Sequence, residues 1–277
     1  MKLEDIKNIT HTHYRKLKKH SKEVADNFDV EAIHQFRVTY KKLRAFLRML
    51  SQKDGTSSEI KVPKKLKKIY TISGYIRDLQ LQQQRIVETT KENRDKPKAY
   101  LMLLQQKINA LKPELLEIFS EKPIHESKMK TDASPPGEFS PGDFQNFVEQ
   151  KWASVYAIIK AGYFSDDDLH AIRKKLKDLL YILAIYKGAG NDLMLLDIWQ
   201  GKDEAYFNKL LAELGKLQDK RTAIDLLKTF WLNSLPKYNR DLLQEIKKIW
   251  IKEKLLEKNL LVTKLTTGFP PQQALPN

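Results

Sequence analysis

The residues with the clearest chemical potential are basic side chains at helical spacing between residues 33 and 50. This segment, IHQFRVTYKKLRAFLRML, contains no Asp, Glu, Gly or Pro. On a helix, His34, Arg37, Lys41, Arg44 and Arg48 form one line about 20 Å long. Cations at this spacing repel one another by roughly a few tenths of a kcal/mol per pair. A solvated basic face is the ordinary interpretation of such a line, but the absence of acids favours binding of an external anion.

The pattern recurs in residues 169–187, LHAIRKKLKDLLYILAIYK. In both segments a His follows a large aliphatic residue and precedes an Arg at i+3 and a Lys at i+7. The second polar line comprises His170, Arg173, Lys174, Lys177 and Tyr181. Two such lines predict two helices that present related basic faces.

A second repeated motif lies downstream of each basic segment. Gly74 precedes Asp78 by four residues in ISGYIRD, and Gly215 precedes Asp219 by four in LGKLQD. Glycine costs about 1 kcal/mol relative to Ala inside a helix, so we expect Gly74 to permit a close helix crossing. Because both motifs recur in the same order, the sequence predicts a duplicated helical unit.

Amphipathic helices must position these lines. Apolar residues recur three and four apart beside each line, as in a helix packing seam. We expect helices over 3–27, the segment capped by Asp29 and ending near Ser51, 60–93, 98–119, 143–161, 169–187, 203–233 (as one helix or two, broken near Gln218) and 239–261. Residues 191–201 are expected to form a short helix or a loop. No stretch alternates as a β-strand does, so the predicted fold class is all-α.

Prolines and glycines divide the chain. We predict a first helical half over 1–122, a Pro/Gly-rich linker over 123–142, a second half over 143–263 and a frayed tail over 264–277. The acids Asp166, Asp167 and Asp168 are expected to cap a helix rather than bind metal. His11, His13 and His20 are read as part of a basic flank, with metal binding as the alternative.

Charge and composition restrict the classes of binding partner. The 277 residues carry 50 Lys and Arg against 35 Asp and Glu, a formal net charge of +15. This excess favours nucleic acid, an anionic membrane surface or a phosphate polymer. The absence of cysteine excludes disulfides, thiolate metal sites and Cys nucleophiles. Without a signal peptide or a run of about 18 apolar residues, a cytoplasmic location is the default.

The two basic segments, GYIRDL and LGKLQD together resemble the conserved histidine α-helical domain (CHAD) family over residues 3–260. The resemblance implies two four-helix bundles related by a pseudo-two-fold and a basic surface or pore that binds inorganic polyphosphate. The family's usual Arg-Arg-Leu-Arg is Lys41-Lys42-Leu43-Arg44 here, and Leu180-Tyr181 replaces Arg-Tyr. The Glu-x-Glu-x-Lys strand of the triphosphate-hydrolysing domain found in some members is absent.

We therefore predict a non-enzymatic polyphosphate-binding protein, with polyphosphate granules as one place where it could gather. No cofactor, catalytic residue, metal or membrane partner is expected. Alternatives are a nucleic-acid-binding protein, a scaffold for an acidic protein, and an enzyme of phosphotransfer or polyphosphate hydrolysis. Aromatic residues fall on the apolar seams, which disfavours base stacking. The predicted binding residues are His34, Arg37, Lys41, Lys42, Arg44, Arg48, Lys61, Lys65, Lys68, Arg77, His170, Arg173, Lys174, Lys177, Tyr181 and Lys216.

Overall fold

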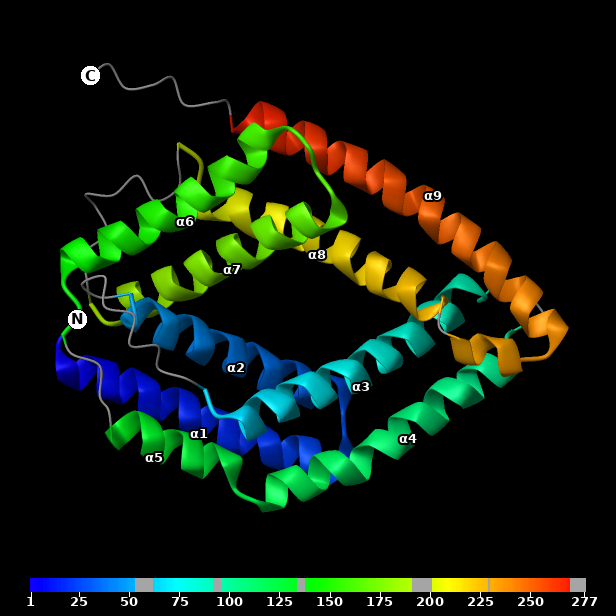
Figure 1. Cartoon of the computed structure of the whole chain (residues 1–277), viewed down its shortest axis with the longest axis horizontal. Coiled ribbons are helices and arrows are strands. Elements are labelled where there is room, and N and C mark those ends of the chain that lie inside the picture. Colours follow the sequence, from blue (N-terminus) through cyan, green and yellow to red (C-terminus); the bar gives the residue numbers. More distant parts are fainter. Residues whose placement is uncertain (53–61, 92–95, 134–137, 191–200, 229, 270–277) are drawn as a thin grey trace. The chain divides into compact units, whose positions relative to one another are not determined.

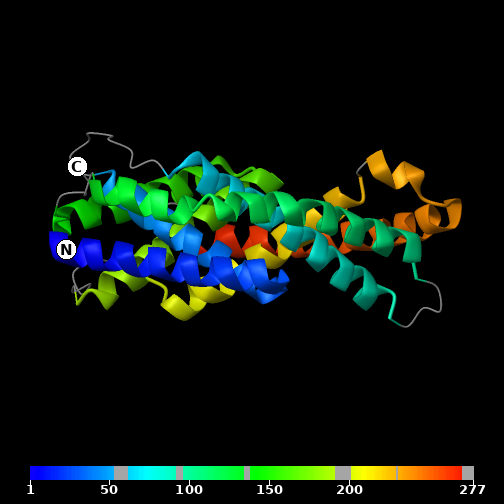
Figure 2. The same ribbon diagram turned by 90° about the horizontal axis from the view of Figure 1, so that it is seen from below.

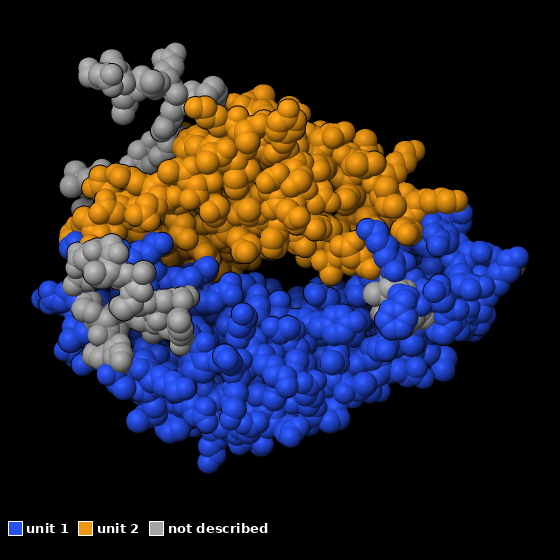
Figure 3. All heavy atoms as spheres, in the orientation of Figure 1, with its two compact units in different colours: residues 1–140, 226–246 blue, residues 141–225, 247–277 orange. Residues whose placement is uncertain are grey.

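The computed structural model describes residues 1–52, 62–91, 96–133, 138–190, 201–228 and 230–269. The elements in these ranges are helices, with no β-strand among them, so the predicted all-α fold class is confirmed (Figures 1 and 2). The chain forms two compact units, residues 1–140 with 226–246 and residues 141–225 with 247–277, coloured separately in Figure 3. The predicted pseudo-two-fold relation between two bundles stays a prediction.

The first unit is built from five consecutive helices. They are α1 (Leu3–Asn27), α2 (Val30–Leu50), α3 (Lys64–Thr89), α4 (Lys98–Ser120) and α5 (Pro123–Ala133). Helix α1 packs against α2 and α5, and α3 packs against α2 and α4. The 3-10 helix η2 (Phe230–Ser234) and the start of α9 (Lys237–Gly268) complete this unit.

The second unit contains α6 (Pro141–Ala161), α7 (Asp166–Gly188), nearly all of α8 (Glu204–Leu226) and the rest of α9. Helix α6 packs against α7. Side chains of α9 form ion pairs with both α7 and α8: Lys254 and Lys258 pair with Asp166 of α7, and Lys264 pairs with Glu213 of α8. The basic line of α7 therefore belongs to a unit held together by four helices.

The apolar seams beside the basic lines are buried as predicted. On α2 the buried seam residues are Phe36, Tyr40, Leu43, Leu47 and Leu50. On α7 they are Ile172, Leu176, Leu179, Leu183 and Tyr186. Full burial of such a side chain stabilises the fold by about 1.5–3 kcal/mol. Each seam therefore fixes the rotation of its helix and with it the direction of the basic line.

The helix starts confirm one predicted cap and correct another. The Asp29 carboxylate accepts hydrogen bonds from the backbone N–H groups of Glu31 and Ala32, as an N-cap should. At α7 the cap is Ser165 rather than an aspartate: its hydroxyl accepts from the Asp168 N–H, and Asp168 accepts from the Ser165 N–H in return. This is a capping box, which satisfies two donors at the helix end. Gly162 has φ +72° directly after α6, a conformation in which glycine commonly ends a helix.

Prolines account for one difference from the prediction. Within the expected linker 123–142, α5 begins at Pro123 and α6 begins at Pro141. Proline fits the first helical position because its missing N–H would have no partner there. From the sequence alone, a proline that begins a helix could not be distinguished from a proline that interrupts one.

Two boundaries near the C-terminus also differ. Helix α8 continues through Gln218, so the alternative of a break there is wrong, and the helix ends at Leu226, before the predicted end at residue 233. Helix α9 extends to Gly268, into the expected tail. Residues 60–61, 191–200 and 270–277 lie outside the described residues. Within the part of the chain that the structure describes, no helix combines the length and apolar character that crossing a bilayer requires.

Candidate anion-binding site

In the first unit, the Arg37 side chain lies across Gly74. A Cβ atom at residue 74 would come within 2.0 Å of the Arg37 Nη1, so only glycine leaves room for the guanidinium there. This Nη1 donates to the Tyr70 carbonyl oxygen at 2.5 Å, and the guanidinium carbon lies 4.2 Å from the Tyr70 ring centroid. Gly74 thus permits the close approach predicted from the sequence, but to an arginine side chain of α2.

Two tyrosines support the arginines of α2. The rings of Tyr40 and Tyr70 stack with centroids 4.5 Å apart, and the Arg44 guanidinium carbon lies 5.9 Å from each ring. Burial raises the pKa of Tyr40, and Arg44 opposes this increase. The Arg44 Nε is buried without a hydrogen-bond partner. A cation in this position has donor capacity that an anion could use.

The second unit repeats the contact between an arginine and a glycine. Atoms of the Arg173 guanidinium lie 3.5–4.0 Å from the Cβ position of Gly215, and the Arg173 Nε is buried without a partner. Burial lowers the pKa of His170, and the charges of Lys174 and Arg173 lower it further. A hydrogen bond with Gln218 partly opposes them. An anion at this face would satisfy Arg173 and favour protonated His170.

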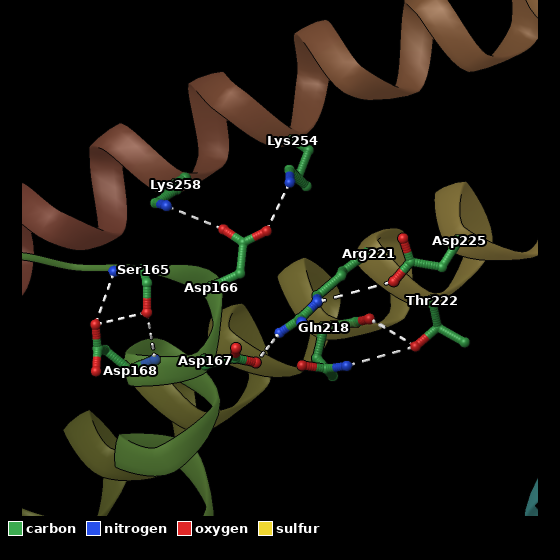
Figure 4. Close-up of polar contacts among 10 residues, drawn as sticks. All are labelled: Ser165, Asp166, Asp167, Asp168, Gln218, Arg221, Thr222, Asp225, Lys254 and Lys258. Carbon is green, nitrogen blue, oxygen red and sulfur yellow. Dashed lines mark hydrogen bonds and ion pairs between the residues drawn. The ribbon is translucent and has the colours of Figure 1, made fainter. Parts of the chain in front are cut away.

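The first turn of α7 is anchored by its acids (Figure 4). Asp166 accepts from Lys254 at 2.7 Å and from Lys258 at 3.0 Å, so one carboxylate joins α7 to α9. Asp167 accepts from Arg221 of α8 at 2.7 Å. Burial alone would raise the pKa of Asp166, but the two lysines hold it below its usual value. Asp166 and Asp167 therefore position the helix that carries His170 through ion pairs, rather than through the capping that the sequence predicted.

The predicted binding residues include basic side chains that pair with a carboxylate and basic side chains that do not. Lys65 pairs with Glu121, and Lys68 pairs with Glu114 at 2.8 Å on the exposed side of α3 that faces α4. In contrast, no ion pair among the described residues joins Arg37, Arg44 or Arg173 to a carboxylate. Lys65 and Lys68, predicted to bind the anion, are thus placed apart from Arg37, on a face where glutamates balance their charge.

The structure places the other predicted residues as follows. On α2, His34, Lys41, Lys42 and Arg48 are half-buried. Arg77 of α3 donates to the Val30 carbonyl oxygen at the start of α2, so it also holds the helix. On α7 and α8, Lys174 and Lys216 are exposed, while the Lys177 ammonium lies 5.7 Å from the Tyr181 ring centroid. Lys61 lies outside the described residues.

Sequence reasoning missed Tyr70 and Gln218. Tyr70 precedes Gly74 by four residues, so the two share a helix face, and that spacing was the available signal. Gln218 follows Gly215 by three residues and meets His170. Both residues are on helices distant in sequence from the basic lines they support, so only the packing of helices reveals them.

The three histidines of α1 lie in three different environments. His11 pairs with Asp132 at 2.9 Å, and His20 pairs with Glu23 at 2.7 Å. His13 is buried, and burial together with the charges of Lys16 and Lys42 lowers its pKa to about 4. In the described ranges, no three His, Asp or Glu side chains are close enough to hold a metal ion.

Comparisons with known proteins show the fold and the family of the chain. No curated protein matches the chain. The crystal structure of the CHAD domain from the plant Ricinus communis is similar, with a TM-score of 0.67 and 18% sequence identity, over 99% of this chain and 92% of that chain. At this identity the similarity shows the fold alone. The sequence profile of the CHAD domain matches residues 8–228, which is most of the chain. The protein therefore belongs to the CHAD domain family.

Proposed function

We propose that this protein binds inorganic polyphosphate, without catalysis, along the basic faces of α2 and α7. The observation that carries the proposal is that Arg37, Arg44 and Arg173 are held in place by the fold yet have no carboxylate partner among the residues described. The Nε atoms of Arg44 and Arg173 are buried without a hydrogen-bond partner, and such a charged donor costs about 1–3 kcal/mol or more. A bound anion removes that cost.

Arginine suits a phosphate chain. Its planar guanidinium can donate two parallel hydrogen bonds to neighbouring phosphate oxygens, while lysine acts as a point charge. The line from His34 to Arg48 is about 20 Å long, so one ligand with repeated charges can contact several side chains. The neighbouring Lys41, Lys42 and Lys177 add charge to the same helices.

The aromatic residues favour polyphosphate over nucleic acid. Tyr40 is 1% exposed and stacks on Tyr70, whose ring also contacts Arg37. These rings support the arginines and leave little surface for stacking a base. Asp166 and Asp167, in the first turn of the helix that carries His170, are engaged by Lys254, Lys258 and Arg221, which supports the non-enzymatic assignment.

A charge-matched pair of variants tests the proposal. Arg44→Gln with Arg173→Gln removes two cations that lack carboxylate partners, and Lys65→Gln with Lys68→Gln removes two that have them. We expect the arginine variant to bind long-chain polyphosphate at least about tenfold more weakly, with a shallower salt dependence, and the lysine variant to bind within about twofold of wild type. Circular dichroism checks that both variants stay helical.

Equal weakening by both variants would refute the site, because binding would then follow net charge alone. Two further measurements test the class of function. If DNA duplexes or single strands displace polyphosphate at equal charge concentration, the preference for polyphosphate is refuted. Release of phosphate from polyphosphate in the presence of Mg²⁺ would refute the non-enzymatic assignment.

A further inference from the structure

A second basic site lies in the first unit, in a groove between α1 and the corner where α4 meets α5. The groove has a volume of about 680 Å³, and no residue of the α2 basic line contributes to its walls. Helices α1 and α5, which form its two sides, pack against each other (Figure 1). Small-molecule sites commonly occupy about 300–1,000 Å³. The groove is therefore large enough for a small ligand.

Hydrogen bonds hold the two walls together. The buried hydroxyl of Tyr14 on α1 is hydrogen bonded to the hydroxyls of Ser127 at 2.9 Å and Thr131 at 2.8 Å on α5. Asp132 of α5 accepts from Lys128 at 2.6 Å and pairs with His11 of α1. These side chains fix the shape of the groove. They are different from the basic residues at its edge, which are Arg15, Lys18, Lys22 and Lys122.

The edge of the groove is strongly positive. Arg15, Lys18 and Lys22 lie on one face of α1 at i, i+3 and i+7, and Lys122 lies between α4 and α5. Within the described part of the chain none of these four cations pairs with a carboxylate. Phe119 and Ile124 add apolar surface to the same groove. Four cations beside an apolar wall predict a ligand that is both multiply charged and partly apolar.

We propose that this groove binds a nucleoside triphosphate or a molecule of the same chemistry, with a flat apolar ring and a tail of linked phosphates. A tail with about four negative charges matches the four cations, and guanidinium and ammonium groups both bind phosphate oxygens well. A carboxylate on an acyl chain would leave most of the cations without a partner. A ligand of phosphate alone would leave the apolar wall uncovered. This inference goes beyond the proposed function and does not depend on it.

Binding of ATP, tripolyphosphate and adenosine to the full chain carrying Arg44→Gln and Arg173→Gln, so that the proposed polyphosphate site does not contribute, tests the proposed chemistry; it is measured without divalent cations. We expect ATP to bind at least about tenfold more tightly than either of the other two, because only ATP uses both parts of the groove. Equal affinity for tripolyphosphate and ATP would overturn the proposal, since charge alone would then explain binding. The absence of ATP binding would overturn it as well.

Variants place the binding in the groove. Arg15→Gln with Lys18→Gln and Lys22→Gln should weaken ATP binding at least about tenfold. Ser21→Trp, at a half-buried groove position, should block ATP without a change in charge. The matched control Lys7→Gln with Lys16→Gln and Lys19→Gln removes the same charge from α1 outside the groove and should bind as wild type does.

The proposed polyphosphate site is tested separately in the same assay. The double variant Arg44→Gln with Arg173→Gln should retain ATP binding, whether or not it loses polyphosphate. Loss of ATP binding in that variant, or wild-type affinity in the Ser21→Trp variant when both remain helical, would overturn the placement in the groove.

Discussion

The two copies of the basic pattern bring an arginine against a helical glycine but support it differently. Arg37 fits against Gly74, donates to the Tyr70 carbonyl oxygen and contacts the Tyr70 ring. Arg173 lies about 1.5 Å farther from the Cβ position of its glycine, and its Nε has no partner.

The side chains around the two arginines explain the difference. By their spacing from His34 and Gly74, Tyr40, Arg44 and Tyr70 correspond to Leu176, Leu180 and Leu211 in the second copy. The first copy thus has an aromatic and cationic cluster where the second has leucines. We infer that Arg37 contributes to folding as well as to binding, whereas Arg173 is more available to a ligand.

The largest expected difference between the units is in acid stability. His13 in the first unit has a pKa near 4 when folded, against about 6.5 when unfolded, while its counterpart by spacing on α6 is Glu149. The unfolded first unit therefore binds a proton more readily than the folded one between these pH values. Stability that is present above pH 6.5 should fall by up to about 3 kcal/mol as the pH drops to 4.

Urea unfolding at pH 7.5, 5.5 and 4.5, monitored by hydrogen exchange in each unit, measures this difference. The first unit should lose stability with acid more steeply than the second, and His13→Gln should remove the additional slope. Identical pH dependence in wild type and His13→Gln would contradict the assignment to His13.

Alanine at the two glycines compares the arginine contacts directly. In Gly74→Ala the new Cβ displaces Arg37, and loss of its charge-assisted hydrogen bond outweighs the gain of about 1 kcal/mol in helix propensity. We expect a net loss of about 1 kcal/mol. In Gly215→Ala the contact is at ordinary distance, so a gain of about 1 kcal/mol is expected. The free energies of unfolding of the two variants should differ by about 2 kcal/mol; equal values would show that the two contacts are alike.

Leu180→Arg tests whether the missing arginine of the second copy limits binding. Leu180 corresponds to Arg44 and is half-buried, so an arginine there can reach the surface along its apolar stem. One additional phosphate contact should raise polyphosphate affinity about three- to tenfold and make the salt dependence steeper by about one unit. Leu180→Met is the uncharged control. Unchanged affinity in Leu180→Arg would place position 180 outside the ligand's path.

The smallest effect is expected from His170. Burial, Lys174 and Arg173 keep its pKa below the usual value, and a bound polyanion opposes that shift. Binding of polyphosphate should therefore take up a proton, and affinity should rise about threefold from pH 8 to pH 6 at constant ionic strength. His170→Gln should flatten this dependence. A slope that persists in His170→Gln would assign the proton to another group.

Much of the fold followed from the sequence. Apolar seams at steps of three and four fixed the helices because burial of one face determines helical rotation, and α1 was predicted with the bounds that the structure has. Prolines were less informative, because the same residue ends one helix and begins another, as Pro123 and Pro141 show.

The sequence by itself determined the basic lines, their duplication and the excess of positive charge, since these depend only on residue type and spacing. Only the tertiary structure decided which cations are already neutralised. Glu114 and Glu121 reach Lys68 and Lys65 from a helix about fifty residues away, while Tyr70 and Gly74 position Arg37. Electrostatic compensation depends on distance in space, and helices distant in sequence meet only after the core has formed.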